Sequence, residues 1–186
     1  MSNRPNDIQL IEMNDSDLEM VREWRNLPEV AQHMYTESII TEEMQKKWWE
    51  KVKANPSFKY FIISFNGKPL GVANFYDINQ QSKRAYWAFY LGDNSVRGMG
   101  IGSKVEFNML TKIFDEMNFN KLCCEVFLEN DIVYKMHEGF GFRREGYYRE
   151  HVQKEDKKFD VIALAMLNKE WQMNKDFMLN KIYFKK

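Results

Sequence analysis

The N-terminal part of the chain carries one strand pattern followed by helical patterns. A short apolar run opens it, and Val21 and Trp24 then recur at helical spacing. Asn14 to Ser16 and Thr41 are residue types that cap helices, and Pro28 opens a turn. The elements predicted here are a strand at 8–13 and helical stretches at 14–26, 29–35 and 41–54.

Strand patterns dominate from residue 60 onward. Asn66-Gly67 between two apolar runs is a strong hairpin signal. Val105, Met109 and Ile113 give helical spacing after a loop that contains glycines. The predicted elements are strands at 60–65, 70–76 and 85–91, a helix up to about 118, a strand at 121–127, a helix at 131–138 and a final hairpin of strands at 143–152 and 158–167.

The element order, β-α-α-β-β-β-α-β-α-β-β, predicts a mixed α/β (α+β) fold with a largely antiparallel first half. The chain has 186 residues, 44% of them hydrophobic and 15% aromatic, which suits one core, so we expect residues 1–186 to form a single domain. Lys plus Arg and Asp plus Glu both number 27. This neutral balance disfavours a nucleic-acid partner.

The two ends of the chain differ in character. Residues 1–7 are polar and without an apolar signal core, and we expect them to be flexible. No run approaches the length of a membrane span. The tail at 172–186 mixes apolar residues with lysines, which suggests docking on the domain or on a second copy in a homodimer. Membrane attachment of the tail is the weaker alternative.

The two cysteines, Cys123 and Cys124, are adjacent. Neighbours in a strand point to opposite faces, so they are poor candidates for a disulfide with each other. They also form no metal-ligand pattern, and no cluster of His, Cys and Asp suggests a metal. We interpret them as strand residues of a cytoplasmic protein that binds no metal.

The loop Arg97-Gly98-Met99-Gly100-Ile101-Gly102-Ser103 lies between a predicted strand and a predicted helix. Glycines allow a tight turn and a close approach to a ligand, and the free N–H groups of a helix start attract anions such as a pyrophosphate. By themselves three alternate glycines fit a plain tight turn about as well. Neither the lysine of a P-loop nor the ribose acid of a Rossmann unit is present at the required place.

The segment Arg97-x-x-Gly100-x-Gly102 resembles the Arg/Gln-x-x-Gly-x-Gly/Ala signature of the GNAT acetyltransferases. Asn130, eleven residues before Gly141, follows a predicted strand as in the family's second motif. The element order agrees as well, so the resemblance covers roughly Ile8 to Trp171. It implies the GNAT fold: a central, mostly antiparallel, twisted sheet that splays open between two strands and is flanked by helices.

The resemblance implies acetyl-CoA as the acetyl donor, bound in the gap between the strands at 85–91 and 121–127. Backbone N–H groups near Phe89, Tyr90 and Leu91 would then face the acetyl carbonyl. Asn130 would contact the pantetheine or the adjacent backbone, and it is also a cap for the helix at Asp131. The residues implied at the phosphates are Val96, Arg97, Gly98, Met99, Gly100, Ile101, Gly102 and Ser103.

Acetyl transfer to an amine needs a base and a proton donor. Glu125, five residues before Asn130, stands where several family members carry a catalytic Glu, and the alternative is a structural ion pair. The family's usual donor is a Tyr four residues before Gly141, where this chain has His137. The donor is therefore His137, Tyr134 one helical turn earlier, or a water molecule.

In this fold the first helices usually shape the acceptor site. We expect Arg25, His33, Met34, Tyr35 and Tyr90 to bind the acceptor. A surface with apolar groups and few acids suits a deoxy-sugar better than a polyamine. Several positions resemble one GNAT branch, the enzymes that acetylate the 4-amino group of a UDP-linked 4-amino-4,6-dideoxy-N-acetyl-altrosamine in pseudaminic acid synthesis, which feeds flagellin glycosylation. These positions are Trp24-Arg25-Asn26, Met34-Tyr35, Trp48-Trp49, Gly146-Tyr147-Tyr148-Arg149-Glu150-His151 and Asp160-Val161.

Two other functions stay open on the sequence. Ribosomal-protein, protein N-terminal and polyamine acetyltransferases share the fold and part of these matches. The change from Tyr to His at position 137 is compatible with an acetyl-CoA sensor that has no turnover, although Glu125 and the intact loop argue against it.

Overall fold

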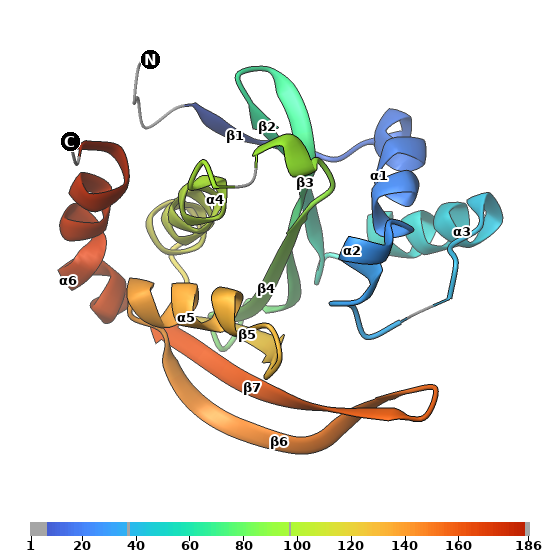
Figure 1. Cartoon of the computed structure of the whole chain (residues 1–186). Helices are drawn as coiled ribbons and strands as arrows, with labels where there is room; N and C mark the ends of the chain where they lie inside the picture. The colour runs from blue at the N-terminus through green and yellow to red at the C-terminus, as the bar shows by residue number, and fades with distance from the viewer. Residues whose placement is uncertain (1–6, 37, 97, 185–186) are drawn as a thin grey trace.

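The computed structural model describes residues 7–36, 38–96 and 98–184. Its centre is a seven-stranded sheet in the order β1-β2-β3-β4-β5-β7-β6 (Figure 1). Neighbouring strands are antiparallel except β4 and β5, which are parallel. The strands are β1 (Ile8–Glu12), β2 (Lys59–Phe65), β3 (Lys68–Asn79), β4 (Arg84–Leu91), β5 (Lys121–Phe127), β6 (Arg143–Lys154) and β7 (Lys157–Leu167). The mixed α/β fold predicted from the sequence is thus confirmed.

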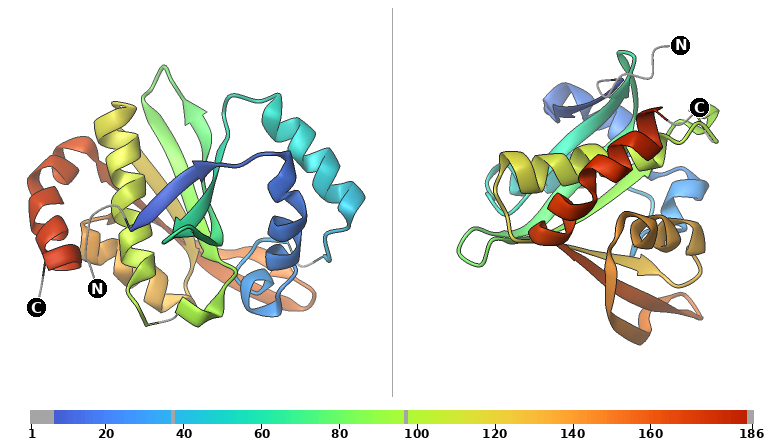
Figure 2. Two further views of the ribbon diagram at one scale, coloured as in Figure 1. Left: turned by 90° about the horizontal axis from the view of Figure 1, so that it is seen from above. Right: turned by 90° about the vertical axis from the view of Figure 1, so that its left-hand side faces the viewer.

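Helices cover both faces of this sheet (Figure 2). They are α1 (Leu18–Arg25), α2 (Pro28–Ala31), α3 (Glu42–Lys53), α4 (Ile101–Leu110), α5 (Asp131–Phe140) and α6 (Asn168–Leu179), with shorter turns at Asp15–Asp17 and Asn94–Val96 and π-helical segments at Thr111–Glu116 and Asn180–Phe184. The alternation within β2 reflects the two layers. Phe61 and Ile63 pack with the α4 side, whereas Ile62 packs with Val21 of α1 and Trp49 of α3.

The hairpin between β2 and β3 forms where the sequence predicts it. Asn66 and Gly67 have φ angles of 51° and 79°. Two consecutive left-handed residues make the tight turn whose twist matches that of antiparallel strands, and Asn-Gly is the favoured pair for it. The turn fixes the register in which β2 and β3 pair.

The sheet opens between β4 and β5. These strands pair only at Arg84–Lys121, Ala85–Leu122 and Tyr86–Cys123. Beyond Tyr86 each strand keeps its outer partner, β3 or β7, but the two no longer pair with each other. The part of β4 after Tyr86 therefore presents backbone N–H and C=O groups to the gap.

The stretch predicted as helical at 29–35 is helical only as far as Ala31. Beyond it the chain turns, and its path is fixed by contacts from distant elements. The buried Lys154 ammonium donates to the carbonyl of Gln32 at 2.9 Å, and the Arg25 guanidinium donates to the Thr36 hydroxyl at 3.0 Å. These contacts tie the segment after α2 to the β6–β7 hairpin and to α1.

Both ends of the described chain are held against the domain, the N-terminal end contrary to the prediction and the C-terminal end in agreement with it. Asp7, assigned to a flexible terminus, instead forms an ion pair with Lys104 of α4, while the rest of that terminus, residues 1–6, lies outside the described residues. The tail is a helix, α6, whose Met178 side chain is buried, and Tyr183 beyond it is buried as well. This confirms docking on the domain.

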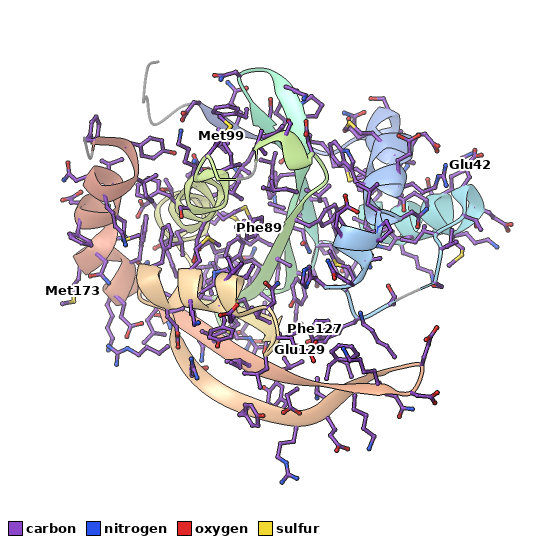
Figure 3. All side chains as sticks on the ribbon, in the orientation of Figure 1. Glu42, Phe89, Met99, Phe127, Glu129 and Met173 are labelled. Atoms are coloured by element: carbon purple, nitrogen blue, oxygen red, sulfur yellow. The ribbon has the colours of Figure 1, made fainter. Side chains whose placement is uncertain are left out.

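The outer side of α6 and of the segment after it exposes large apolar side chains among polar ones such as Gln172 and Asp176. Met173, Phe177 and Phe184 are exposed, and Met173 points away from the molecule in Figure 3. Whether a second copy of the chain covers this side stays a prediction. Among the described residues, no helix combines the length and the apolar character that crossing a bilayer requires.

Replacing Tyr183 tests the docking of the tail. The ring is 1% exposed and packs edge-on against Phe107 at 5.9 Å between centroids. Tyr183→Ala is expected to lower the free energy of unfolding by about 3–5 kcal/mol, because it empties a buried aromatic site. Tyr183→Phe, which removes only the hydroxyl that accepts a hydrogen bond from Asn108, is expected to cost about 1 kcal/mol. Denaturant unfolding measures both, and equal losses would contradict this packing.

Candidate active site

A cavity of about 1330 Å³ lies over the gap between β4 and β5. It is lined by α1, α2 and the segment after α2 on one side, and by the start of α4 and by α5 on the other. Pockets for one small ligand usually measure about 300–1,000 Å³. This cavity has room for two substrates that meet at the gap.

The loop before α4 forms one end of this cavity. Gly98 and Gly100 have φ angles of 81° and 71°, and apart from their immediate chain neighbours no atom of the described residues lies within 4 Å of where a Cβ would stand. Gly100 precedes the first turn of α4, and no side chain caps that turn. The N–H groups of a helix start therefore face open space next to the cavity, which is the arrangement an anion requires.

Most of the residues predicted to contact the coenzyme line the cavity. Those that do are Phe89, Tyr90, Leu91, Val96, Gly98, Gly100, Ile101, Gly102, Ser103 and Asn130. Met99 is 52% exposed and is not part of the lining, and Arg97 lies outside the described residues. The expected Asn130 side-chain cap on α5 is wrong, since that side chain makes no capping hydrogen bond. It lines the cavity instead.

Glu125 and Tyr35, predicted separately as base and acceptor contact, meet directly. The Tyr35 hydroxyl donates to Oε2 of Glu125 at 2.7 Å. The Tyr35 ring also lies 5.4 Å from Phe127 and 6.4 Å from His151. Burial, and then the carboxylate, raise the pKa of Tyr35, so its phenol stays protonated and keeps donating. Phe89 and Phe127, labelled in Figure 3, belong to the two strands that border the gap.

His137 lies on the other side of β5 from Glu125. Its ring packs edge-on against Trp87 at 5.2 Å between centroids, and Nδ1 lies 2.9 Å from Oε1 of Glu106 on α4. His137 lines the cavity even though only 3% of the residue is exposed. Tyr134, the other candidate donor, is not part of the lining and packs under the Arg144 guanidinium, so we set it aside.

The alternation of β5 separates these two groups. Glu125 contacts Tyr35 in the segment after α2, whereas Cys124 packs into the core beside α4. Successive strand residues face opposite sides, and the gap in the sheet connects the two sides. The candidate base, Glu125, and the candidate proton donor, His137, therefore stand on opposite sides of one opening.

Arg25 of α1 places a cation in the cavity lining, on the side where the acceptor is predicted to bind. It lines the cavity with His33 and Met34, two other residues predicted to bind the acceptor, and its only hydrogen bond among the described residues goes to Thr36. Burial lowers the pKa of Arg25, while the phenols of Tyr90 and Tyr60 counteract that effect. Burial also raises the pKa of Tyr60, to about 12. No carboxylate in the described part of the chain pairs with this guanidinium.

Glu106 and the aromatic residues Trp48 and Tyr60 belong to this region although the sequence analysis did not select them. The sequence pattern around Glu106 could have identified it as a candidate. It stands on the apolar face of α4, near Ile101, Met109 and Leu110, where a charged residue is out of place. Across residues 7–36, 38–96 and 98–184, no three His, Cys, Asp or Glu side chains are arranged to hold a metal ion.

Comparisons with known proteins agree with this geometry. A family pattern described as an acetyltransferase (GNAT) domain matches residues 10–163. The acetyltransferase PseH of Campylobacter jejuni is 27% identical over 153 residues, which cover 82% of this chain and 88% of that protein. The uncharacterized N-acetyltransferase YokL of Bacillus subtilis is 21% identical over 92% of this chain and 90% of its own length.

Solved structures show the same fold. The spermidine N-acetyltransferase of Vibrio cholerae, solved in complex with CoA and spermine, superposes with a TM-score of 0.83. It is 18% identical, and the match covers 89% of this chain and 98% of that one. At this identity the likeness concerns the fold alone.

Proposed function

Since the chain belongs to the GNAT acetyltransferase family, we propose that it transfers the acetyl group of acetyl-CoA to the 4-amino group of a UDP-linked 4-amino-4,6-dideoxy-N-acetyl-altrosamine. Membership makes it an acetyl-CoA-dependent N-acetyltransferase. The sugar acceptor is the finer part of the proposal. It would place the enzyme in pseudaminic acid synthesis.

The observation that carries the sugar acceptor is Arg25. A partly buried guanidinium without a carboxylate partner needs an anion, and the diphosphate of a nucleotide sugar is one. A polyamine would bring its own positive charges to the same place. Three acids among the described residues line the cavity: Glu29, Asp93 and Glu125. Asp93 is paired with Lys68 at 2.6 Å, Glu125 accepts a hydrogen bond from Tyr35 at the gap, and Glu29 also has a partner, so they form no cluster of unpaired carboxylates for a polyamine.

The apolar part of the acceptor side supports the same class of substrate. Met34, Ile40, Met44 and Trp48 line the cavity near Arg25. Such a surface suits the methyl group and ring of a deoxy-sugar, while a few polar groups fix its orientation. Two relatives named acetyltransferase PseH, both from Campylobacter jejuni, support the branch that the sequence resemblance indicates.

The arrangement of the groups suggests the order of events. Glu125 takes a proton from the amine, directly or through water, and the amine nitrogen attacks the thioester carbonyl. Backbone N–H groups of β4 beyond Tyr86 stabilise the oxyanion. The C–S bond then breaks, and the CoA thiolate takes a proton from His137. Each step uses a group that lines the cavity or borders the gap.

Arg25→Gln tests this acceptor. Because a hydrogen bond to a charged group contributes about 1.5–3 kcal/mol, the KM for the sugar nucleotide is expected to rise about 10- to 100-fold. The KM for acetyl-CoA should stay within about twofold. Arg25→Lys, which keeps the charge but loses the planar fork, should show a smaller rise. Steady-state kinetics measure both, and an unchanged sugar KM would contradict the assignment.

A further inference from the structure

A buried pair of ionisable groups lies beside the gap. Glu106 of α4 is 0% exposed, and His137 of α5 is 3% exposed. The two helices lie on the same face of the sheet (Figures 1 and 2). Oε1 of Glu106 lies 2.9 Å from Nδ1 of His137, while Oε2 is buried and has no hydrogen-bond partner in the described part of the chain. The hydrogen bond to His137 therefore offsets part of the desolvation cost of burying this carboxyl group.

Within the part of the chain that the structure describes, the side chains that pack against the His137 ring from the other elements are aromatic and not carboxylates. Trp87 of β4 packs edge-on against the ring, and Phe142 before β6 lies 5.4 Å away between centroids. Cys124 of β5 is a thiol whose pKa is raised well above its usual value by burial, so it stays uncharged. Burial also raises the pKa of Glu106, and the only charge that opposes this effect is that of His137. Glu106 therefore dominates the electrostatic environment of this imidazole.

We propose that Glu106 is a positioning residue for the proton donor: it binds Nδ1 of His137, directs Nε2 toward the cavity and stabilises the protonated pair that returns a proton to the CoA thiolate. This inference rests on the proposed role of His137. It explains why a carboxyl group stands on the apolar face of α4. It also explains how an imidazole serves at a position where the family usually has a phenol.

The proton balance of this step is simple. Before transfer the pair holds two protons, one on Nε2 and one shared between Nδ1 and Oε1. The Nε2 proton passes to the thiolate sulfur, and an S–H bond forms as the N–H bond breaks. The pair is left as a neutral imidazole with its Nδ1 proton and a Glu106 carboxylate. The two groups titrate as a unit, so the charge belongs to the pair.

The first test is Glu106→Gln, which keeps the size and the hydrogen bond but removes the charge. Without the carboxylate 2.9 Å from Nδ1, the protonated imidazole loses the negative partner that stabilises it. The proton transfer to the thiolate, which requires the protonated imidazole, then declines at a lower pH than in the wild-type enzyme. We expect kcat at neutral pH to fall about tenfold or more, and the basic limb of the kcat–pH profile to move to lower pH. The KM for acetyl-CoA should stay unchanged. An unchanged kcat and limb would overturn the inference.

A double-mutant cycle separates positioning from mere structure. If Glu106 acts through His137, then Glu106→Gln has no further effect on kcat in a His137→Phe background. If Glu106→Gln lowered kcat by the same factor in the His137→Phe background as in the wild-type enzyme, the inference would be overturned. Glu138→Gln is the matched control, because Glu138 follows His137 directly but binds Arg144 at 2.6 Å. It should change neither kcat nor the limb. If His137→Phe keeps full activity, the proposed donor itself is wrong, and the inference fails with it.

A second measurement needs neither an acceptor nor turnover. The chain has three histidines, so imidazole nitrogen resonances can be followed by NMR, and His137→Phe assigns the one of interest. At neutral pH the imidazole nitrogen resonances of His137 are expected to shift toward those of a neutral ring in Glu106→Gln and to stay unchanged in Glu138→Gln. Unchanged resonances in Glu106→Gln would overturn the inference even where the wrong acceptor leaves the activity assay silent.

Discussion

Glu125→Gln is expected to lower kcat by about 10²- to 10⁴-fold, the range that a positioned general base contributes. Glutamine keeps the size of the side chain and still accepts the hydrogen bond from Tyr35. It cannot take a proton from the amine. The KM for acetyl-CoA should change less than about twofold, because the predicted coenzyme contacts lie on β4, in the loop before α4, at the start of α4 and at Asn130, and not at Glu125. Steady-state kinetics with saturating acceptor measure the effect.

Tyr35→Phe is the matched control for this prediction. It removes the donor at 2.7 Å from the carboxylate but leaves the carboxylate itself and the contact between the rings of residues 35 and 127. Its kcat should fall by less than about tenfold, which corresponds to the free energy that roughly one hydrogen bond contributes. If Glu125→Gln lost no more than Tyr35→Phe, Glu125 would be a structural group, as the alternative interpretation of the sequence holds.

Gly100→Val is expected to weaken CoA binding about 10- to 100-fold. At a φ of 71° a β-branched residue is strained by about 1–3 kcal/mol, and relief of that strain rotates the N–H groups at the start of α4. The space next to Gly100 is open, so the added side chain also occupies the place of the ligand. Isothermal titration with CoA measures the dissociation constant.

Gly67→Val provides a control with the same backbone strain. Gly67 has a φ of 79° and open space around it, but it lies in the hairpin between β2 and β3. It should lose stability to a similar extent while its affinity for CoA stays at the wild-type value. Equal affinity losses in both variants would mean that general destabilisation, and not the phosphate loop, explains the result for Gly100.

Local sequence patterns correctly predicted the elements that neighbouring residues in the chain specify by themselves. Asn66-Gly67 specifies its hairpin through two positive φ angles, and Thr41 caps α3 by accepting from the backbone of Met44. The gap between β4 and β5 came from the family resemblance, because nothing in either strand alone requires them to separate after Tyr86. The roles of the individual coenzyme and acceptor residues stay predictions.

The features that the sequence did not predict depend on distant contacts. Tyr35 and Glu125 are ninety positions apart, and their hydrogen bond exists only because the segment after α2 turns toward β5. The helical pattern at 29–35 was overridden by contacts such as that of Lys154 with Gln32. Glu106 and His137 meet only because α4 and α5 pack on the same face of the sheet. Local propensity contains no information about such pairings.

The acceptor is tested most directly by measuring thiol release from acetyl-CoA with a UDP-4-amino-dideoxy sugar, spermidine and N-terminal peptides in parallel. The account predicts turnover with the amino sugar, and a value of kcat/KM for spermidine and peptides that is lower by at least about 100-fold. Efficient turnover with spermidine or a peptide and none with the sugar would contradict it. Arg25 would then need another role, although the fold and the acetyl transfer would stand.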